Sequence, residues 1–185
     1  MTSATDTSSR SSLRLVSTKT VYRGKMIDVR VDRIVEPRGI PVQREVVCHG
    51  GSAVVLPYFR EGRILLVRQF RYPARQALWE LVAGGVEPGE SPKQAAEREL
   101  REETGYTAKS FKLLFKFYPS PGVLSEKMHL FEAVDLTRGT AEPEEDERIQ
   151  VKLFSMPKLK EMVGRGKIQD GKTLVGLLWL LGRRS

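Results

Sequence analysis

The chain has 185 residues, of which 40% are hydrophobic and 29% charged, and its formal net charge is +8. These values suit one globular domain with a core, and they exclude a disordered chain and a collagen-like fibre. The single cysteine, Cys48, excludes a disulfide-stapled mini-protein. We find no apolar run of the roughly 18 residues that a membrane span needs and no apolar signal segment. We therefore expect a cytoplasmic enzyme or binding protein.

The basic residues are scattered along the chain. A nucleic-acid-binding protein usually carries a clustered basic stripe or a recognisable module, and neither is found. Attraction to small phosphorylated ligands fits the positive charge equally well. We expect no nucleic-acid or membrane partner, and a merely soluble basic surface stays as the alternative.

The N-terminal quarter divides into a tail and an arm. Residues 1–12 are rich in serine and threonine without periodicity, which predicts a disordered tail. Residues 13–48 are predicted to form an N-terminal β arm, and residues 49–185 the main domain. The strands expected in the arm cover 19–22, 26–34 and 42–47.

In the main domain, apolar runs predict six strands and the spacing of leucines and caps predicts helices. The expected strands cover 53–58, 64–70, 79–83, 112–118, 128–134 and 149–154. Ser91, Pro92 and Gln94 form a capping-box pattern, so a helix is expected from there to Thr104, with Gly105 as its stop. Further helices are expected over 157–163 and 173–181. This mixture predicts an α/β (α+β) sandwich with a mixed β-sheet.

Three glutamates on the first helix, Glu99, Glu102 and Glu103, have the spacing that places them on one face. They lie in its C-terminal half, where the helix dipole disfavours negative charge. One interpretation is a solvated acidic face whose negative charge is partly neutralised by neighbouring arginines. The other is a magnesium platform, because Mg²⁺ is commonly held by carboxylates together with substrate phosphates.

The wider spacing favours the second interpretation. The segment GGVEPGESPKQAAERELREETGY matches the Nudix box from Gly84 to Gly105, and departs only at Tyr106, where the family usually has an aliphatic residue. The chain therefore resembles the Nudix hydrolases, which cleave a nucleoside diphosphate linked to another moiety with Mg²⁺ or Mn²⁺. The resemblance implies their α/β/α sandwich fold.

Segments outside the box resemble the ADP-ribose pyrophosphatase branch of that family. They include Pro121, the branch's usual marker, and LLVRQFRYPARQALWELVAG upstream of the box. Val82 departs from the proline of many members. The resemblance implies hydrolysis of ADP-ribose to AMP and ribose 5-phosphate. Another nucleotide sugar or a dinucleotide stays open as substrate, as does a non-catalytic nucleotide sensor.

The resemblance also implies roles for individual residues. The metal ligands would be the carbonyl of Ala83 and the carboxylates of Glu99, Glu102, Glu103 and Glu147. The catalytic residues would be Glu145 as general base, Arg98, which orients the glutamates, and Glu102. The register of the acidic loop leaves Glu144 as an alternative base.

Substrate contacts are implied at two places. Arg71 and Glu126 would bind substrate from the main domain, and Arg44, Glu45 and Met26 would do so from the arm. In the family the Arg-Glu pair often acts across a subunit interface. We therefore expect a homodimer in which the arm helps to build the substrate pocket, while a surface ion pair is the alternative for Arg44 and Glu45.

Overall fold

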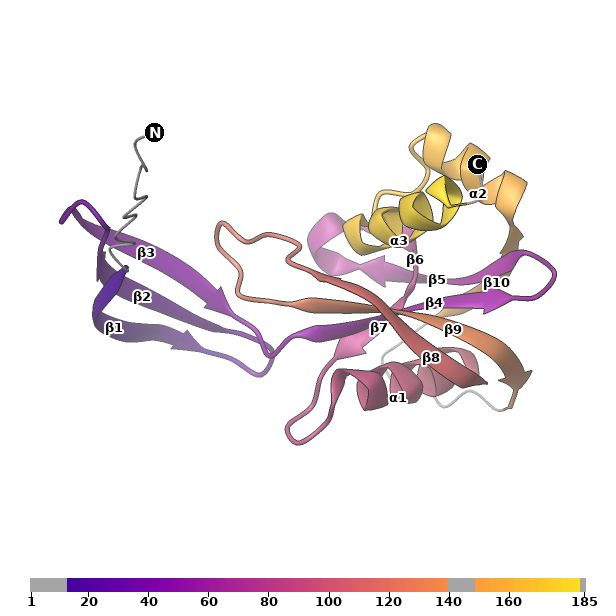
Figure 1. Cartoon of the computed structure of the whole chain (residues 1–185), viewed down its shortest axis with the longest axis horizontal. Coiled ribbons are helices and arrows are strands. Elements are labelled where there is room, and N and C mark those ends of the chain that lie inside the picture. The colour runs from indigo at the N-terminus through magenta and orange to yellow at the C-terminus, as the bar shows by residue number, and fades with distance from the viewer. Residues whose placement is uncertain (1–12, 140–148, 184–185) are drawn as a thin grey trace, which may run out of the picture. The chain divides into compact units, whose positions relative to one another are not determined.

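Strands dominate the computed structural model, which describes residues 13–139 and 149–183 (Figure 1). The described residues form two compact units. The arm unit contains the chain up to residue 49 together with 120–125, and the main unit contains 50–119 and the residues from 126 onward.

The arm unit is an antiparallel sheet of three strands in the order β1-β2-β3. These strands are β1 (Arg14–Arg23), β2 (Asp28–Val35) and β3 (Pro41–Cys48). The end of β3 is also paired with the segment 120–125, because the N–H of Val47 donates to the carbonyl of Val123 (2.8 Å) and the N–H of Ser125 donates to the carbonyl of Val47 (2.9 Å). Every residue of β1 is exposed.

The main unit is built on a seven-stranded mixed sheet in the order β10-β5-β4-β9-β8, with β6 paired to β5 and β7 to β4. Its strands are β4 (Ser52–Phe59), β5 (Arg63–Arg71), β6 (Gln76–Glu80), β7 (Val82–Gly85), β8 (Tyr106–Phe117), β9 (Met128–Arg138) and β10 (Gln150–Ser155). The central pair β4–β9 is parallel, whereas the other pairs of this sheet are antiparallel.

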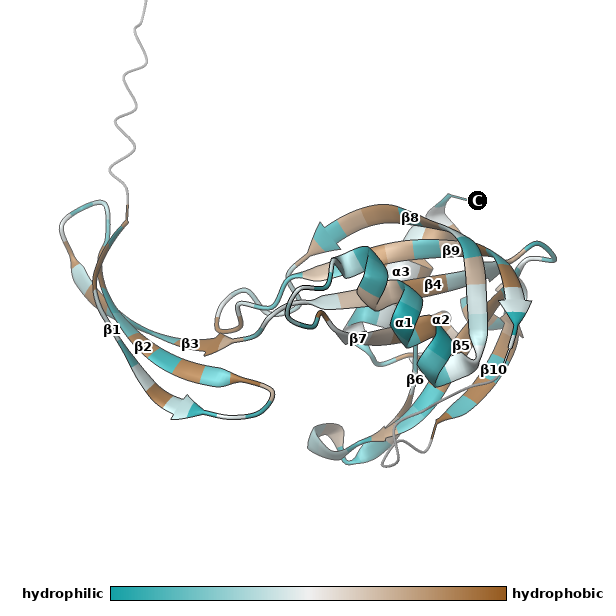
Figure 2. Ribbon diagram, turned by 90° about the horizontal axis from the view of Figure 1, so that it is seen from below, coloured by the Kyte–Doolittle hydropathy of each residue, from teal (hydrophilic) through white to brown (hydrophobic). Residues whose placement is uncertain are grey.

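Helices cover both faces of this sheet (Figure 1). They are α1 (Pro92–Thr104) on one face and α2 (Met156–Gly164) and α3 (Gly171–Gly182) on the other. Successive strand side chains point to opposite faces, so Val55 packs in the cluster of Leu100 from α1, whereas Leu56 packs in that of Leu177 from α3. In Figure 2 the α1 ribbon is mostly hydrophilic, while β4 is largely hydrophobic.

This arrangement confirms the predicted sandwich with a mixed sheet and the predicted helix from Pro92 to Thr104. The single strand expected over 79–83 is wrong. The backbone N–H of Leu81 donates to the Thr173 hydroxyl (2.7 Å), so the chain leaves one ladder at this residue and continues in another. The short 3-10 helix Tyr72–Ala74 was not expected from the sequence. None of the helices in the described part of the chain is long and apolar enough to cross a membrane.

Candidate functional site

The helix α1 is fixed at both ends by local hydrogen bonds. The Ser91 hydroxyl accepts from the N–H of Gln94, the Gln94 side chain accepts from the N–H of Ser91, and Gly105 ends the helix in the left-handed conformation (φ 72°). Its apolar face, with Ala96 and Leu100, is buried against the sheet. The helix therefore holds its carboxylates at a defined position along β7.

The three predicted glutamates differ in their exposure. The Glu99 and Glu102 side chains are 13% and 28% exposed, whereas residue Glu103 is only 4% exposed. A buried carboxylate is expensive unless charge or hydrogen bonds compensate it. This difference argues against a simple solvated acidic face.

Gly84 in β7 makes room for the first of these carboxylates. A Cβ placed on Gly84 would collide with the carboxylate of Glu99. Only a glycine lets the helix side chain approach the strand backbone this closely. The predicted backbone ligand, Ala83, is the residue before Gly84 in β7.

Arg98 connects the carboxylates with the loop before α1. Its Nη1 donates to Glu99 Oε1 (2.6 Å) and Glu102 Oε2 (3.1 Å), and its Nε and Nη2 donate to the two oxygens of Glu90 (both 3.1 Å). Nη2 also donates to the Gly85 carbonyl (3.0 Å). Hydrogen bonding to Glu90, together with the nearby carboxylates, raises the pKa of Arg98 above its usual value. Arg98 is therefore a fixed cation that offsets the negative charge of the cluster.

The donor chemistry of this cluster fits a divalent cation, because hard cations take oxygen ligands. The contact at Gly84 is also compatible with a metal site, because it places the Glu99 carboxylate against the backbone of β7. Within the described residues no three His, Cys, Asp or Glu side chains are placed so that they could hold a metal ion, and Nη1 of Arg98 instead bridges Glu99 and Glu102. The remaining predicted ligand, Glu147, lies outside the described residues, as do Glu144 and Glu145.

Arg71, at the end of β5, forms a bidentate ion pair with Glu80 of β6. Its Nε donates to Oε1 and its Nη2 to Oε2, both at 2.8 Å. The hydrogen bonds to Glu80 raise the pKa of Arg71, and the charge of Glu103 adds to this effect. The predicted substrate arginine therefore lies within the electrostatic field of the acidic helix.

Glu126 is the first residue of the main unit after the arm segment 120–125. Its Oε1 accepts a hydrogen bond from the Ser52 hydroxyl, and the Ser52 N–H donates to the Lys127 carbonyl (3.1 Å). This carboxylate is thus oriented by the first residue of β4.

The three other predicted substrate residues belong to the arm unit. Arg44 Nη2 contacts Glu36 Oε1 at 2.6 Å, and Glu45 is exposed. Met26 is 70% exposed.

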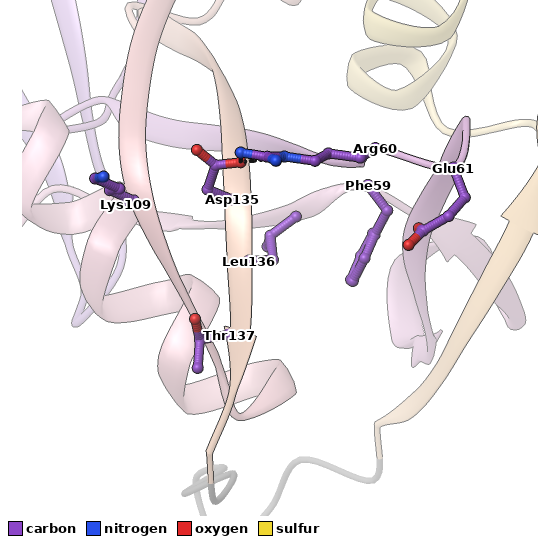
Figure 3. A pocket seen from close by; sticks show the side chains of 7 residues that line it. All are labelled: Phe59, Arg60, Glu61, Lys109, Asp135, Leu136 and Thr137. Carbon is purple, nitrogen blue, oxygen red and sulfur yellow. Dashed lines mark hydrogen bonds and ion pairs between the residues drawn. The ribbon is translucent and has the colours of Figure 1, made fainter.

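A pocket of about 410 Å³ lies elsewhere on the main unit, at the end of the β4–β5 hairpin and beside β8 and β9 (Figure 3). Arg60 crosses it and contacts Asp135 (Nε to Oδ1, 2.8 Å). The lining residues are Phe59, Arg60, Glu61, Lys109, Asp135, Leu136 and Thr137. This lining contains none of the residues predicted to act in catalysis.

Comparison with known proteins gives the family. The NUDIX domain matches residues 49–174. The chain belongs to the NUDIX family. Members of this family generally use divalent metal ions, in keeping with the carboxylates and the glycine contact described above.

Curated relatives cover most of the chain. The ADP-ribose pyrophosphatase of Bacillus subtilis (strain 168) is 36% identical over 169 residues, which are 90% of this chain and 91% of that protein. The GDP-mannose pyrophosphatase of Yersinia enterocolitica serotype O:8 / biotype 1B is 36% identical over 154 residues, 77% of this chain and 80% of that protein. This NUDIX chain is therefore a pyrophosphohydrolase of the ADP-ribose pyrophosphatase type.

A solved structure confirms the NUDIX fold. The crystal structure of an ADP compounds hydrolase superposes with a TM-score of 0.81 at 22% identity, covering 92% of this chain and 95% of the other. The sequence-based assignment to the family and its sandwich fold is thereby confirmed.

Sequence reasoning missed two polar residues of the main unit that pack beneath Arg71. Glu80 and Lys172 form a buried contact between β6 and α3, with Nζ and Oε2 2.5 Å apart. A carboxylate inside the apolar run from Trp79 to Ala83 was the signal that could have indicated a buried partner. The partner itself, far away in sequence, gave no such signal.

Proposed function

We propose that this chain is a divalent-metal-dependent hydrolase that cleaves ADP-ribose to AMP and ribose 5-phosphate, with Mg²⁺ or Mn²⁺ as the cation. One observation carries the proposal: the Glu99 carboxylate lies in the space left by Gly84, and Arg98 bridges it to the Glu102 carboxylate on the same helix. Carboxylates held in this way support metal-assisted phosphate chemistry in a member of the NUDIX family.

In this proposal the ligands are the Ala83 carbonyl and the carboxylates of Glu99, Glu102, Glu103 and Glu147. A cation bound there supplies Lewis-acid stabilisation of the diphosphate and activation of water. Arg98 keeps the glutamates oriented through charge-assisted hydrogen bonds, which are shorter and stronger than neutral ones. The proton of the attacking water goes to a carboxylate of the acidic loop, which we assign to Glu145, with Glu144 as the alternative.

Substrate binding is proposed to involve both units. Arg71 presents a fixed cation beside the acidic helix and suits a phosphate, since a guanidinium matches phosphate geometry. Glu126, oriented by Ser52, would accept hydrogen bonds from ribose hydroxyls. We assign Arg44, Glu45 and Met26 of the arm to contacts with substrate bound by a partner subunit.

The homodimer is part of the same proposal. The β1 edge strand is exposed along its whole length, and its apolar residues include Leu15 (55%), Val16 (54%) and Val21 (54%). An exposed apolar edge strand is normally covered, and a symmetric second copy of the arm would cover it. The proposed location is the cytoplasm, as expected from the sequence.

A substrate panel tests the function. ADP-ribose, GDP-mannose and a dinucleotide are each incubated with the full chain and Mg²⁺, with EDTA as control, and the products are resolved by chromatography. We expect AMP and ribose 5-phosphate from ADP-ribose, and no product with EDTA.

GDP-mannose is the second candidate substrate, because a GDP-mannose pyrophosphatase is as similar in identity as the ADP-ribose pyrophosphatase above. Faster turnover of GDP-mannose than of ADP-ribose would favour it. Binding of ADP-ribose without turnover in Mg²⁺ or Mn²⁺ would instead favour a nucleotide sensor.

A further inference from the structure

Beneath the predicted substrate arginine lies a buried carboxylate with two cationic partners. Glu80 is 1% exposed, and it contacts both Arg71 and Lys172. Burial alone would raise the pKa of Glu80, but hydrogen bonding to Arg71 and the charge of Lys172 lower it below its usual value. Glu80 is therefore an anion in the folded protein.

Arg71 and Lys172 contact the Glu80 carboxylate in different ways. Arg71 takes both oxygens with Nε and Nη2, whereas Lys172 contacts only Oε2 (2.5 Å). The second terminal nitrogen of Arg71, Nη1, has no hydrogen-bond partner among the described residues, and the Arg71 side chain is 39% exposed. One edge of the guanidinium is thus held and the other is available to an anion.

Strand alternation indicates which face Arg71 occupies. Arg71 is an even number of residues after Leu65 and Val67 in β5, so it shares their face of the sheet. Leu65 and Val67 pack in the cluster that contains the α1 residue Leu100. Arg71 therefore lies on the face of the acidic helix.

Lys172 is itself fixed at the beginning of α3. Its Nζ contacts Asp170 Oδ1 (3.0 Å), and Asp170 caps the helix by accepting from the Thr173 N–H (3.0 Å) and hydroxyl (2.5 Å). The same Thr173 hydroxyl accepts from the N–H of Leu81, the residue after Glu80. The first turn of α3 and the end of β6 are thus joined at two points, which holds the ammonium of Lys172 against Glu80.

We propose that Lys172 is a positioning residue for substrate binding: it fixes the Glu80 carboxylate, which in turn holds Arg71 so that Nη1 faces an anionic phosphate of the substrate. Lys172 does not touch substrate, because its side chain is 9% exposed and occupied by Glu80 and Asp170. The inference rests on the proposed function, in which Arg71 contacts the diphosphate. It adds α3, a helix outside the metal-binding segment, to the determinants of substrate affinity.

The test compares Lys172→Met, which removes the charge and keeps the length, with Lys172→Arg, which keeps the charge. Lys158→Met is the matched control, because Lys158 pairs with Glu161 on α2 and is 52% exposed. For hydrolysis of ADP-ribose by the full chain with Mg²⁺, we expect Lys172→Met to raise KM about tenfold and change kcat by less than about twofold. We expect Lys172→Arg to restore most of the affinity and the control to match the wild type.

A second readout does not depend on turnover. The Nε–Hε signal of Arg71 in ¹⁵N-labelled protein, identified by its loss in Arg71→Lys, should exchange slowly with water in the wild type. In Lys172→Met it should exchange faster, because Glu80 is then less firmly held. Unchanged KM together with unchanged exchange in Lys172→Met would overturn the inference.

The two readouts separate the two proposals. Faster exchange in Lys172→Met, in a chain whose wild type neither binds nor hydrolyses ADP-ribose, would refute the proposed function and support the positioning contact. If Lys172→Met does not fold, Glu80→Gln/Lys172→Met removes both charges together and avoids an uncompensated buried anion. The same rise in KM is expected there, and a wild-type KM in this variant would overturn the inference.

Discussion

The carboxylate of Glu99 lies where a side chain on Gly84 would project. The two residues come from different elements, a helix and a strand, and neither is informative alone. Their contact ties the position of a proposed metal ligand to the absence of a single methyl group. A substitution that barely disturbs the strand is therefore expected to disturb the chemistry.

Gly84→Ala is expected to lower kcat about 100-fold, because the added methyl displaces the Glu99 carboxylate. The displaced atoms belong to the end of a flexible side chain, so the thermal midpoint should change little. Gly85→Ala is the neighbouring control, since a Cβ at Gly85 meets nothing within 4 Å. Steady-state kinetics and thermal melting of both variants test this prediction. An equal loss of kcat in Gly84→Ala and Gly85→Ala would contradict it.

Glu103→Gln is expected to reduce turnover about 100-fold or more at saturating Mg²⁺, because glutamine keeps the shape but loses the charge. Glu97→Gln on the same helix is the control, because Glu97 is 47% exposed and pairs with Lys93. Circular dichroism should show both variants folded. Retention of most activity by Glu103→Gln would refute its assignment as a ligand.

Glu145→Gln should lower kcat far more than KM, because a general base acts in the transition state and adds little to ground-state binding. This prediction rests on sequence alone, since the acidic loop lies outside the described residues. Parallel kinetics of Glu144→Gln and Glu147→Gln check the register. If Glu145→Gln behaves like the wild type and Glu144→Gln does not, the base is Glu144.

Glu80 is expected to contribute to the acid sensitivity of the fold. Burial opposes its ionisation, but Arg71 and Lys172 overcome this and leave its pKa lowered. Its contribution is therefore complete above the ordinary glutamate pKa of about 4.3 and is lost as the pH falls through the lower folded value.

Glu80→Gln should accordingly destabilise the protein by about 3 kcal/mol at neutral pH and flatten the decline of the unfolding free energy in acid. Urea unfolding across a pH series measures both effects. Glu161→Gln is the control, because hydrogen bonding to Lys158 also lowers the pKa of Glu161, but on the surface. An equally large change in the control would contradict the assignment to the buried pair.

The arm is expected to mediate dimerisation and to contribute to activity. Leu15→Glu and Val21→Glu place charges on exposed apolar positions of β1 and should weaken the dimer and raise KM. Removal of residues 1–12 should leave dimerisation and activity unchanged, whereas removal of residues 1–48 should abolish dimerisation and activity. Light scattering and kinetics test these variants, and a fully active wild-type monomer at micromolar concentration would refute the prediction.

Local signals predicted much of this fold. Ser91, Gln94 and Gly105 define the ends of α1 through bonds between near neighbours, and the helix begins and ends where they predict. Two of the predicted strands, 53–58 and 64–70, correspond to β4 and β5, and Gly62 in the turn between them has the left-handed conformation (φ 75°).

Features that depend on distant contacts were not predicted. The break between β6 and β7 follows from the bond between Leu81 and Thr173, and the pairing of Glu80 with Lys172 depends on the same approach of α3. Neither partner's identity can be read from periodicity. The spacing of Glu99, Glu102 and Glu103 predicted a shared face, but only the structure shows that Arg98 bridges two of them.

The parallel pairing of β4 with β9 also constrains how the chain can fold. Ser52 pairs with Met128 and Pro57 with Ala133, so the middle of the sheet joins segments made at very different times during synthesis. Until β9 has emerged from the ribosome, the edge of β4 that pairs with β9 is uncovered and apolar. Such long loop closures slow folding. We therefore expect nascent chains that end before residue 128 to depend on chaperones, even though α1 and its proposed ligands are already complete.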